Sequence, residues 1–392
     1  MDKMIEQGKN LIKLIKSVLK DEKVELSNPD YEAIYQLSTF HSVQNMLFYG
    51  IKDFQSEVNV ELLKKLSKDN KMQLAKTTTQ ELEKELIEEK LNDLKIKYLL
   101  MKGSVIKYLY PSIDMRSMAD IDIYFEKDKA KEVKKMMLDL GYDNESYLHG
   151  NHDTYMKVPF MNVEMHRDLM NESYEMSRYY KNVSHKLLKG KHEYEYVFSN
   201  EDYYIYMISH AAKHFSNGGM GIRNVVDEYV YLNHYQNDLN FEYIKEELEK
   251  LELIKFENNL RKLSDYWFND QINEEDRETL ELMENFIIES GTYGTVNHYV
   301  LKNLMGKEAI NKMNSNKFKY YMRRAFPPFS VMKQRNPSLV KFPFLLPFFY
   351  FTRLLKFIFK RDKNIDSEIK AAGQANKEDV EKVKKVHDDI GA

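Results

Sequence analysis

Cysteine is absent from the 392 residues of this chain. Its absence excludes disulfide bonds, zinc sites built from thiolates and a cysteine nucleophile. The first twenty residues also lack the uninterrupted apolar core of a secretory signal peptide. We therefore expect the protein to act inside the cell, in the cytoplasm.

An excess of positive charge is missing as well. The 59 Lys and Arg residues are nearly balanced by 62 Asp and Glu residues, so the formal net charge is −3. Non-specific binding to nucleic acid depends on basic side chains that neutralise phosphates. A nucleic-acid polymer is therefore not favoured as a substrate.

The aromatic and aliphatic stretch at 342–359 is too short and too interrupted for a membrane span, which needs roughly 20 consecutive apolar residues. The interrupting residues are Pro343, Pro347, Arg353 and Lys356. Two interpretations stay open. The stretch packs on the globular body, or residues 342–363 make a peripheral membrane contact in which the basic residues that follow the stretch face lipid head groups: Lys360, Arg361 and Lys363.

Apolar spacing predicts four regions. Residues 1–95 carry apolar positions three to four apart, as in amphipathic helices. Residues 96–195 alternate short strands with helices, which predicts a small mixed sheet. Residues 196–315 are helical again from a capping-box-like start at Ser199, and residues 316–392 hold the apolar segment and a charged tail. The fold class is α+β.

Two aspartates and a glutamate form the candidate centre of the second region. Asp120 and Asp122 are two residues apart at a predicted strand over 121–125, so their carboxylates point the same way about 7 Å apart. Strand propensity disfavours such a pair, which therefore needs another reason. Glu164 lies in a second strand-like stretch that forms a predicted hairpin, 153–158 with 162–166. Three clustered carboxylates predict a site for Mg²⁺ or Mn²⁺.

A glycine-serine turn precedes these acids. Gly103 follows a predicted strand over 96–101 and would let the backbone approach a polyphosphate, while Ser104 opens a predicted helix over 104–110 whose first amides favour anions. Lys102 and Arg116 could add positive charge beside the phosphates. Turn and acids in this order indicate nucleotidyl transfer, in which a hydroxyl attacks the α-phosphorus of a nucleoside triphosphate and pyrophosphate leaves.

The segments MKGS, RSMADIDIY and VEMH resemble motifs of a bacterial family of uncharacterised nucleotidyltransferases in the DNA polymerase β-like superfamily. The resemblance spans about residues 30–300 and implies a metal-dependent transferase fold. It implies catalytic and metal-binding roles for Asp120, Asp122 and Glu164. It implies nucleotide or phosphate binding for Lys102, Gly103, Ser104, Arg116, His166, His210, His214, Arg223 and Asp227. The chain departs from the family pattern at Ile222, where leucine is expected, and in a longer spacer between Ser104 and Asp120.

Structural roles remain open for several of these side chains. His166 can satisfy a local hydrogen bond. His210 and His214, four apart on a predicted helix, can pack against neighbours or bind zinc. Arg223 and Asp227 are also four apart and can form an ion pair on one helix.

Two functions remain as hypotheses. The first is an enzyme that uses a nucleoside triphosphate and transfers its nucleoside monophosphate to a small molecule, a sugar, a lipid-linked carrier or a protein. The second is a catalytically silent nucleotide-binding regulator or antitoxin-like partner, which keeps the fold without turnover.

Overall fold

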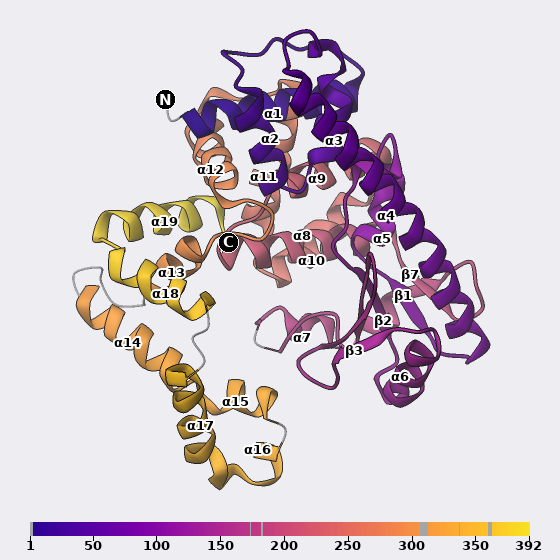
Figure 1. The fold of residues 1–392 in the computed structure, drawn as a ribbon, viewed down its shortest axis with the longest axis vertical. Helices are drawn as coiled ribbons and strands as arrows, with labels where there is room; N and C mark the ends of the chain where they lie inside the picture. Colours follow the sequence, from indigo (N-terminus) through magenta and orange to yellow (C-terminus); the bar gives the residue numbers. More distant parts are fainter. Residues whose placement is uncertain (1–2, 173, 182, 306–312, 337, 360–362) are drawn as a thin grey trace.

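The computed structural model describes residues 3–172, 174–181, 183–305, 313–336, 338–359 and 363–392. It has the α+β architecture expected from the sequence, with one mixed sheet and many surrounding helices (Figure 1). Among the described residues, no helix is long and apolar enough to cross a membrane. Two basic residues of the candidate membrane contact, Lys360 and Arg361, lie outside the described part. The division into four regions stays a prediction.

Four helices form the N-terminal part: α1 (Lys3–Lys20), α2 (Tyr31–Phe40), α3 (Gln44–Gly50) and α4 (Val60–Asp93). Helix α2 begins after Asp30, because the Asp30 side chain accepts a hydrogen bond from the Ala33 amide at 3.1 Å and caps the helix. Helix α4 has 34 residues. Its first half is polar and buries few apolar side chains, so it shows no wide apolar stripe.

Seven strands make the sheet, in the order β3-β4-β5-β2-β1-β7-β6. Strand β2 pairs in parallel with β5 and β1 in parallel with β7, whereas the other pairs are antiparallel. The predicted hairpin is present as β4 and β5. The strand bounds are β1 (Tyr98–Leu100), β2 (Ile121–Phe125), β3 (Asp143–Ser146), β4 (His152–Lys157), β5 (Met161–His166), β6 (Leu187–Lys189) and β7 (Glu195–Phe198).

The two faces of the sheet are covered by different helices. Alternate residues of β2 and β5 (Ile121, Ile123, Val163 and others) pack against α4 and against α6 (Ala130–Asp139). The residues between them point to the opposite face, where α8 (Asn200–Ser216) lies. Because strand side chains alternate, this arrangement directs Asp122 and Glu164 toward α8.

Some predicted elements differ in length. The helix after the glycine-serine turn has only four α-helical residues, α5 (Gly103–Ile106), and continues as a 3₁₀-helix over Lys107–Leu109 before Pro111. Strand β1 has three residues instead of six. Strands β3, β6 and β7 were not expected. Strand β3 (DNES) is entirely polar, and β6 (LLK) and β7 (EYVF) have only three and four residues, too few for a clear alternation.

Helices dominate the rest of the chain. Helix α8 begins where expected, since the Ser199 hydroxyl accepts a hydrogen bond from the Asp202 amide at 3.0 Å. Figure 1 shows that α14 to α17 form an arm that extends from the helical body, and that α18 and α19, which follow in the chain, pack against this body. The bounds are α7 (Ser177–Tyr180), α9 (Ile222–Tyr235), α10 (Phe241–Lys250), α11 (Ile254–Asn269), α12 (Arg277–Ser290), α13 (Val296–Leu304), α14 (Met313–Ala325), α15 (Phe329–Arg335), α16 (Ser338–Lys341), α17 (Leu346–Phe359), α18 (Lys363–Gln374) and α19 (Lys377–Ile390).

A buried carboxyl group links α8, α9 and α11. The Tyr204 hydroxyl lies 2.6 Å from an oxygen of Glu228 and 2.8 Å from an oxygen of Glu257, which also accepts a hydrogen bond from Arg261. One hydroxyl hydrogen cannot serve both carboxylates, so a protonated Glu228 that donates to Tyr204 completes the chain of hydrogen bonds. Burial and the charge of Glu257 raise the pKa of Glu228 to about 8, in agreement with a neutral carboxyl.

Glu228→Gln is therefore expected to stabilise the protein at alkaline pH. The raised pKa of Glu228 means that, between pH 4.5 and about 8, the folded wild type keeps a proton that the unfolded chain releases. Its stability therefore falls as pH rises through that window, whereas the amide of the variant does not titrate. The two free energies of unfolding should differ by about 5 kcal/mol above pH 8 and should converge near pH 4. Urea unfolding across this range measures the difference, and parallel curves would contradict the protonated state.

Candidate functional site

Three carboxylates meet on the face of the sheet that is directed toward α8. The parallel register of β2 and β5 places Asp122 opposite Glu164, and Asp120 immediately precedes β2. One oxygen from each of the three side chains lies within 4.8 Å of the other two. The structure thus brings together the three acids that the sequence suggested as one candidate metal site.

The acids titrate differently because their neighbours differ. Burial and the negative charge of Asp122 raise the pKa of Asp120 to about 6. Burial also acts to raise the pKa of Asp122, but the charges of Lys102 and His166 outweigh it and hold that pKa well below the usual range. The pKa of Glu164 is lowered as well, since a hydrogen bond from His166 overcomes the effect of burial.

Lys102 occupies a strained turn between β1 and α5. Its backbone has φ 50° and ψ −124°, a conformation that side chains rarely adopt. The Tyr203 hydroxyl donates to the Lys102 carbonyl at 2.7 Å, and the Lys102 ammonium lies 2.5 Å from Asp122. Such strain persists where the surroundings fix the backbone, and here the result is an ammonium aimed at the acidic cluster.

The glycine-serine turn differs in detail from the sequence interpretation. A Cβ atom on Gly103 would lie 2.6 Å from the Met118 sulfur, so any other residue here would require the Met118 side chain to move. The Ser104 amide donates to the Met101 carbonyl, and its buried hydroxyl has no hydrogen-bond partner. The Val105 and Ile106 amides both donate to the Lys102 carbonyl, which leaves the predicted anion site at the start of α5 with few free amides.

His166 lies beneath the acids and is almost fully buried. Its Nε2 atom is 2.8 Å from Asp122 and 3.2 Å from Glu164, and its Nδ1 atom is 3.4 Å from the Asn151 amide nitrogen. Burial lowers its pKa, but the hydrogen bonds to the two acids prevail and raise it. His152, Glu164 and His166 also form a second group with suitable metal-ligand spacing, which shares Glu164 with the first.

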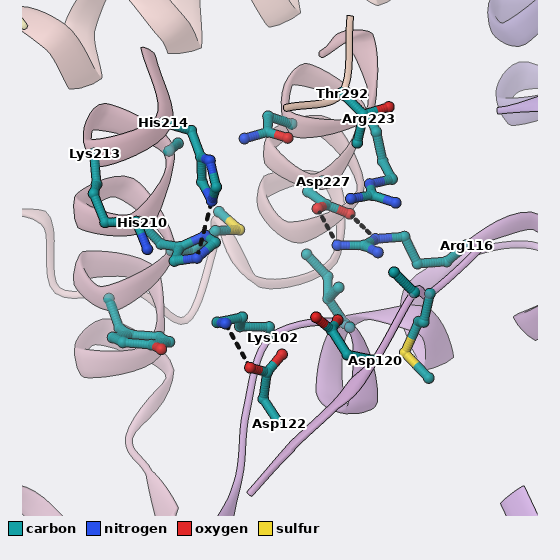
Figure 2. Close-up of a pocket in the computed structure, with 18 of the residues that line it drawn as sticks. Lys102, Arg116, Asp120, Asp122, His210, Lys213, His214, Arg223, Asp227 and Thr292 are labelled. Atoms are coloured by element: carbon teal, nitrogen blue, oxygen red, sulfur yellow. Dashed lines mark hydrogen bonds and ion pairs between the residues drawn. The ribbon is translucent and has the colours of Figure 1, made fainter. Parts of the chain in front are cut away.

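A cavity of about 250 Å³ separates the acids from α8 and α9. Figure 2 shows His210, Lys213 and His214 of α8 on one side of it, with Asp120 and Asp122 on another. Ten of the residues singled out from the sequence line the cavity, whereas Ser104 and His166 do not appear in its lining. The ten are Lys102, Gly103, Arg116, Asp120, Asp122, Glu164, His210, His214, Arg223 and Asp227.

The two histidines of α8 face each other, with their Nε2 atoms 3.3 Å apart. Burial and the nearby charge of Lys213 lower both pKa values, and that of His214 falls to about 3. Both rings are therefore neutral near pH 7, and one donates to the other. Neither belongs to a metal-binding group among the residues that the structure describes.

Arg116 and Asp227 form a buried ion pair across the cavity wall (Figure 2). The guanidinium donates through Nε and Nη2 to the two carboxylate oxygens, at 2.7 and 2.8 Å, and the Tyr110 hydroxyl donates to the same carboxylate at 2.7 Å. Asp227 thus pairs with Arg116 and not with Arg223, its neighbour on α9. Arg223 donates instead to the Ser117 carbonyl at 2.9 Å, and its buried Nε atom has no partner.

Sequence reasoning overlooked Lys213, the strongest new member of the lining. Burial and the charge of Lys102 lower the pKa of Lys213 to about 8, so its ammonium is charged near neutral pH. Lys213 is three residues after His210, so the two side chains share one face of the helix. This spacing was the only sequence feature that could have pointed to Lys213. Thr292 and Tyr293 also line the cavity, but they come from the loop after α12 and carry no local motif.

Comparison with known proteins gives one family assignment. A family model described as "uncharacterised nucleotidyltransferase" matches residues 27–269, more than half of the chain. No curated protein and no solved structure matches. The matched range includes the strained turn, the three acids and Lys213 of α8. The chain therefore belongs to the family of uncharacterised nucleotidyltransferases.

Proposed function

We propose that this protein transfers a nucleoside monophosphate from a nucleoside triphosphate to a hydroxyl or phosphate group of an acceptor. One observation carries the proposal: three clustered carboxylates face Lys213 of α8 and Arg223 of α9 across a single cavity. A metal-bound triphosphate has the complementary charge pattern, with a cation for the acids and phosphates for the basic groups.

Asp120, Asp122 and Glu164 would hold divalent metal, Mg²⁺ or Mn²⁺. The donor set fits, because it consists of hard carboxylate oxygens that already converge within 4.8 Å. Two such ions stabilise the attacking and leaving oxygens of an in-line displacement. Lys102 and His166 share one oxygen of Asp122 and so keep this carboxylate ionised and fixed in place.

The phosphates would lie toward α8 and α9. Lys213 offers a charged ammonium, and Arg223 offers a guanidinium with an unpaired Nε atom. His210 and His214 are neutral, and because one ring donates its N–H to the other, only the accepting ring keeps an N–H for a phosphate. Arg116 and Asp227 neutralise each other, so we assign them the role of shaping the cavity wall.

The enzyme hypothesis is tested with triphosphates labelled at the α or the γ phosphate, Mg²⁺ and a cell extract that supplies acceptors. We expect the α label to enter a product and the γ label to leave as pyrophosphate. Incorporation of the γ label would instead indicate phosphoryl transfer. Tight nucleotide binding without product, for all four bases, would favour the silent regulator.

Lys213→Met is expected to weaken binding of a non-hydrolysable triphosphate about tenfold or more, since a hydrogen bond to a charged group contributes about 1.5–3 kcal/mol. The ammonium binds phosphate only while protonated, so wild-type affinity should fall as pH rises through the Lys213 pKa of about 8. Lys213→Arg should move this fall to higher pH, because guanidinium stays charged. Calorimetric titration from pH 6.5 to 9.5 measures both effects.

Lys189→Met serves as the matched control, because Lys189 is exposed on β6 at the edge of the sheet. It should bind the triphosphate like the wild type. Equal affinities for Lys213→Met and this control would contradict the phosphate role.

A further inference from the structure

An arm of four helices extends from the body between α13 and α18. It comprises residues 313–336 and 338–359, with α14, α15, α16 and α17, and we call it the C-terminal arm (Figure 1). The arm has a small core of its own, since Met332 and Leu339 are buried. The Tyr350 hydroxyl donates to the Pro327 carbonyl at 2.6 Å, which ties α17 to the turn after α14.

Large apolar side chains nevertheless point outward from the arm. Phe344, Phe348 and Phe351 are 75%, 58% and 60% exposed. Phe348 and Phe351 are three residues apart and share one face of α17, and Phe344 lies in the 3₁₀ turn Pro343–Leu345 just before this helix. Phe318 and Met322 repeat the pattern on α14, where they are four residues apart and also exposed. So many exposed large apolar side chains in one part of the molecule indicate an interaction site.

The same part of the chain has an unusual charge. Between Glu308 and Asp362 there is no acidic residue, while there are twelve Lys and Arg residues, although the whole chain has a net charge of −3. The exposed basic residues of the arm include Arg323 on α14 and Lys341 on α16. A surface that combines exposed phenylalanine with unbalanced positive charge requires a partner that is both apolar and anionic.

We propose that the C-terminal arm docks on the surface of a membrane that contains anionic lipid. Phenylalanine side chains can enter the boundary between head groups and acyl chains, while lysine and arginine remain among the lipid phosphates. Helix α17, with 14 residues, would lie in the plane of the membrane. This property goes beyond nucleotidyl transfer and does not depend on it. It would bring the protein to a surface that carries lipid-linked molecules.

Flotation of the full chain with vesicles tests the proposal. We expect binding to vesicles of phosphatidylcholine with phosphatidylglycerol, little binding to phosphatidylcholine alone, and release by salt, which screens charges beyond about 8 Å at physiological ionic strength. Phe344→Ser, Phe348→Ser and Phe351→Ser together should reduce binding about tenfold or more. These side chains are exposed, so the variant should keep the wild-type thermal unfolding midpoint.

Two further variants sharpen the test. Arg323→Glu with Lys341→Glu should reduce binding to the anionic vesicles while leaving the phenylalanines in place. A matched control replaces three exposed apolar residues of the body with serine and should bind like the wild type: Val60, Leu82 and Leu188. Equal losses in the control and the phenylalanine variant would overturn the proposal.

Other occupants of the arm would give different results. A dimer that the phenylalanine variant converts to a monomer, with no vesicle binding, would show that a second copy covers the arm. Binding to a single-stranded oligonucleotide but not to vesicles would show a nucleic-acid surface instead. Asp120→Asn with Asp122→Asn should bind vesicles like the wild type, so a failure of nucleotidyl transfer and a failure of membrane docking are distinguishable.

Discussion

Replacing Asp120 with asparagine is expected to lower the rate of nucleotidyl transfer at least about a thousandfold, which corresponds to about 4 kcal/mol of transition-state stabilisation. The amide keeps the size of the side chain but removes the charge that a divalent ion needs. The rate of product formation from α-labelled triphosphate at saturating Mg²⁺ measures the effect.

The same substitution should leave the fold as stable as before or more stable. Burial and the charge of Asp122 raise the pKa of Asp120 to about 6, so its ionised form opposes folding above that pH in the absence of metal. The sign follows from linkage: the unfavourable contribution is absent below about pH 4, grows as pH rises and is complete above pH 6. Asp120→Asn should therefore gain about 3 kcal/mol of stability at pH 7.5 and almost none at pH 4.

Asp122→Asn provides the contrast, because Lys102 and His166 would lose their ionised partner. It should abolish activity and also lower stability. If Asp120→Asn destabilised the protein as much as Asp122→Asn does, Asp120 would be a structural residue and the metal-site interpretation would fail.

Breaking the Arg116–Asp227 pair is expected to have the largest effect on stability. Asp227→Ala leaves a buried guanidinium without its two charge-assisted hydrogen bonds, and Tyr110 loses its acceptor. Removal of one partner of a buried ion pair costs about 3–5 kcal/mol. Urea unfolding at pH 7.5 measures the loss, and Arg116→Ala should show a loss of similar size.

The double variant Arg116→Met with Asp227→Leu separates charge from packing. Because neither side chain then leaves a buried charge, its stability should recover much of what each single substitution loses. Single substitutions that each change stability by less than about 1 kcal/mol would contradict the buried pair.

The acids and their face could be predicted from sequence because local rules govern them. Asp120 and Asp122 share a face through strand alternation, and the spacing within VEMH gives Glu164 and His166 the same relation. The parallel register that brings Asp122 opposite Glu164 is not local, but short α/β motifs leave few alternatives for it.

The basic side of the cavity was less predictable, because contacts between residues far apart in the sequence determine which side chains pair and which face the cavity. Asp227 pairs with Arg116, 111 residues away, although the i,i+4 spacing equally allowed a pair with Arg223. Lys213 is one of many lysines in the chain, and only burial against the cavity sets it apart. The start of α5 also differs from the predicted anion site. Its first amides already donate to backbone carbonyls, and the amino-acid sequence does not reveal these hydrogen bonds.

The segment at 342–359 could be described from sequence but not placed. Its prolines and basic residues excluded a membrane span, yet both packing and exposure remained open. The structure shows Phe344, Phe348 and Phe351 on the surface of an arm, because only tertiary packing decides which face of a helix is covered.

A crystal structure with Mn²⁺ and a non-hydrolysable triphosphate tests the central claim most directly. The proposal predicts anomalous manganese signal bounded by Asp120, Asp122 and Glu164, with the triphosphate extending toward Lys213 and Arg223. Manganese absent from the three acids, or a nucleotide bound elsewhere while the cavity stays empty, would contradict it.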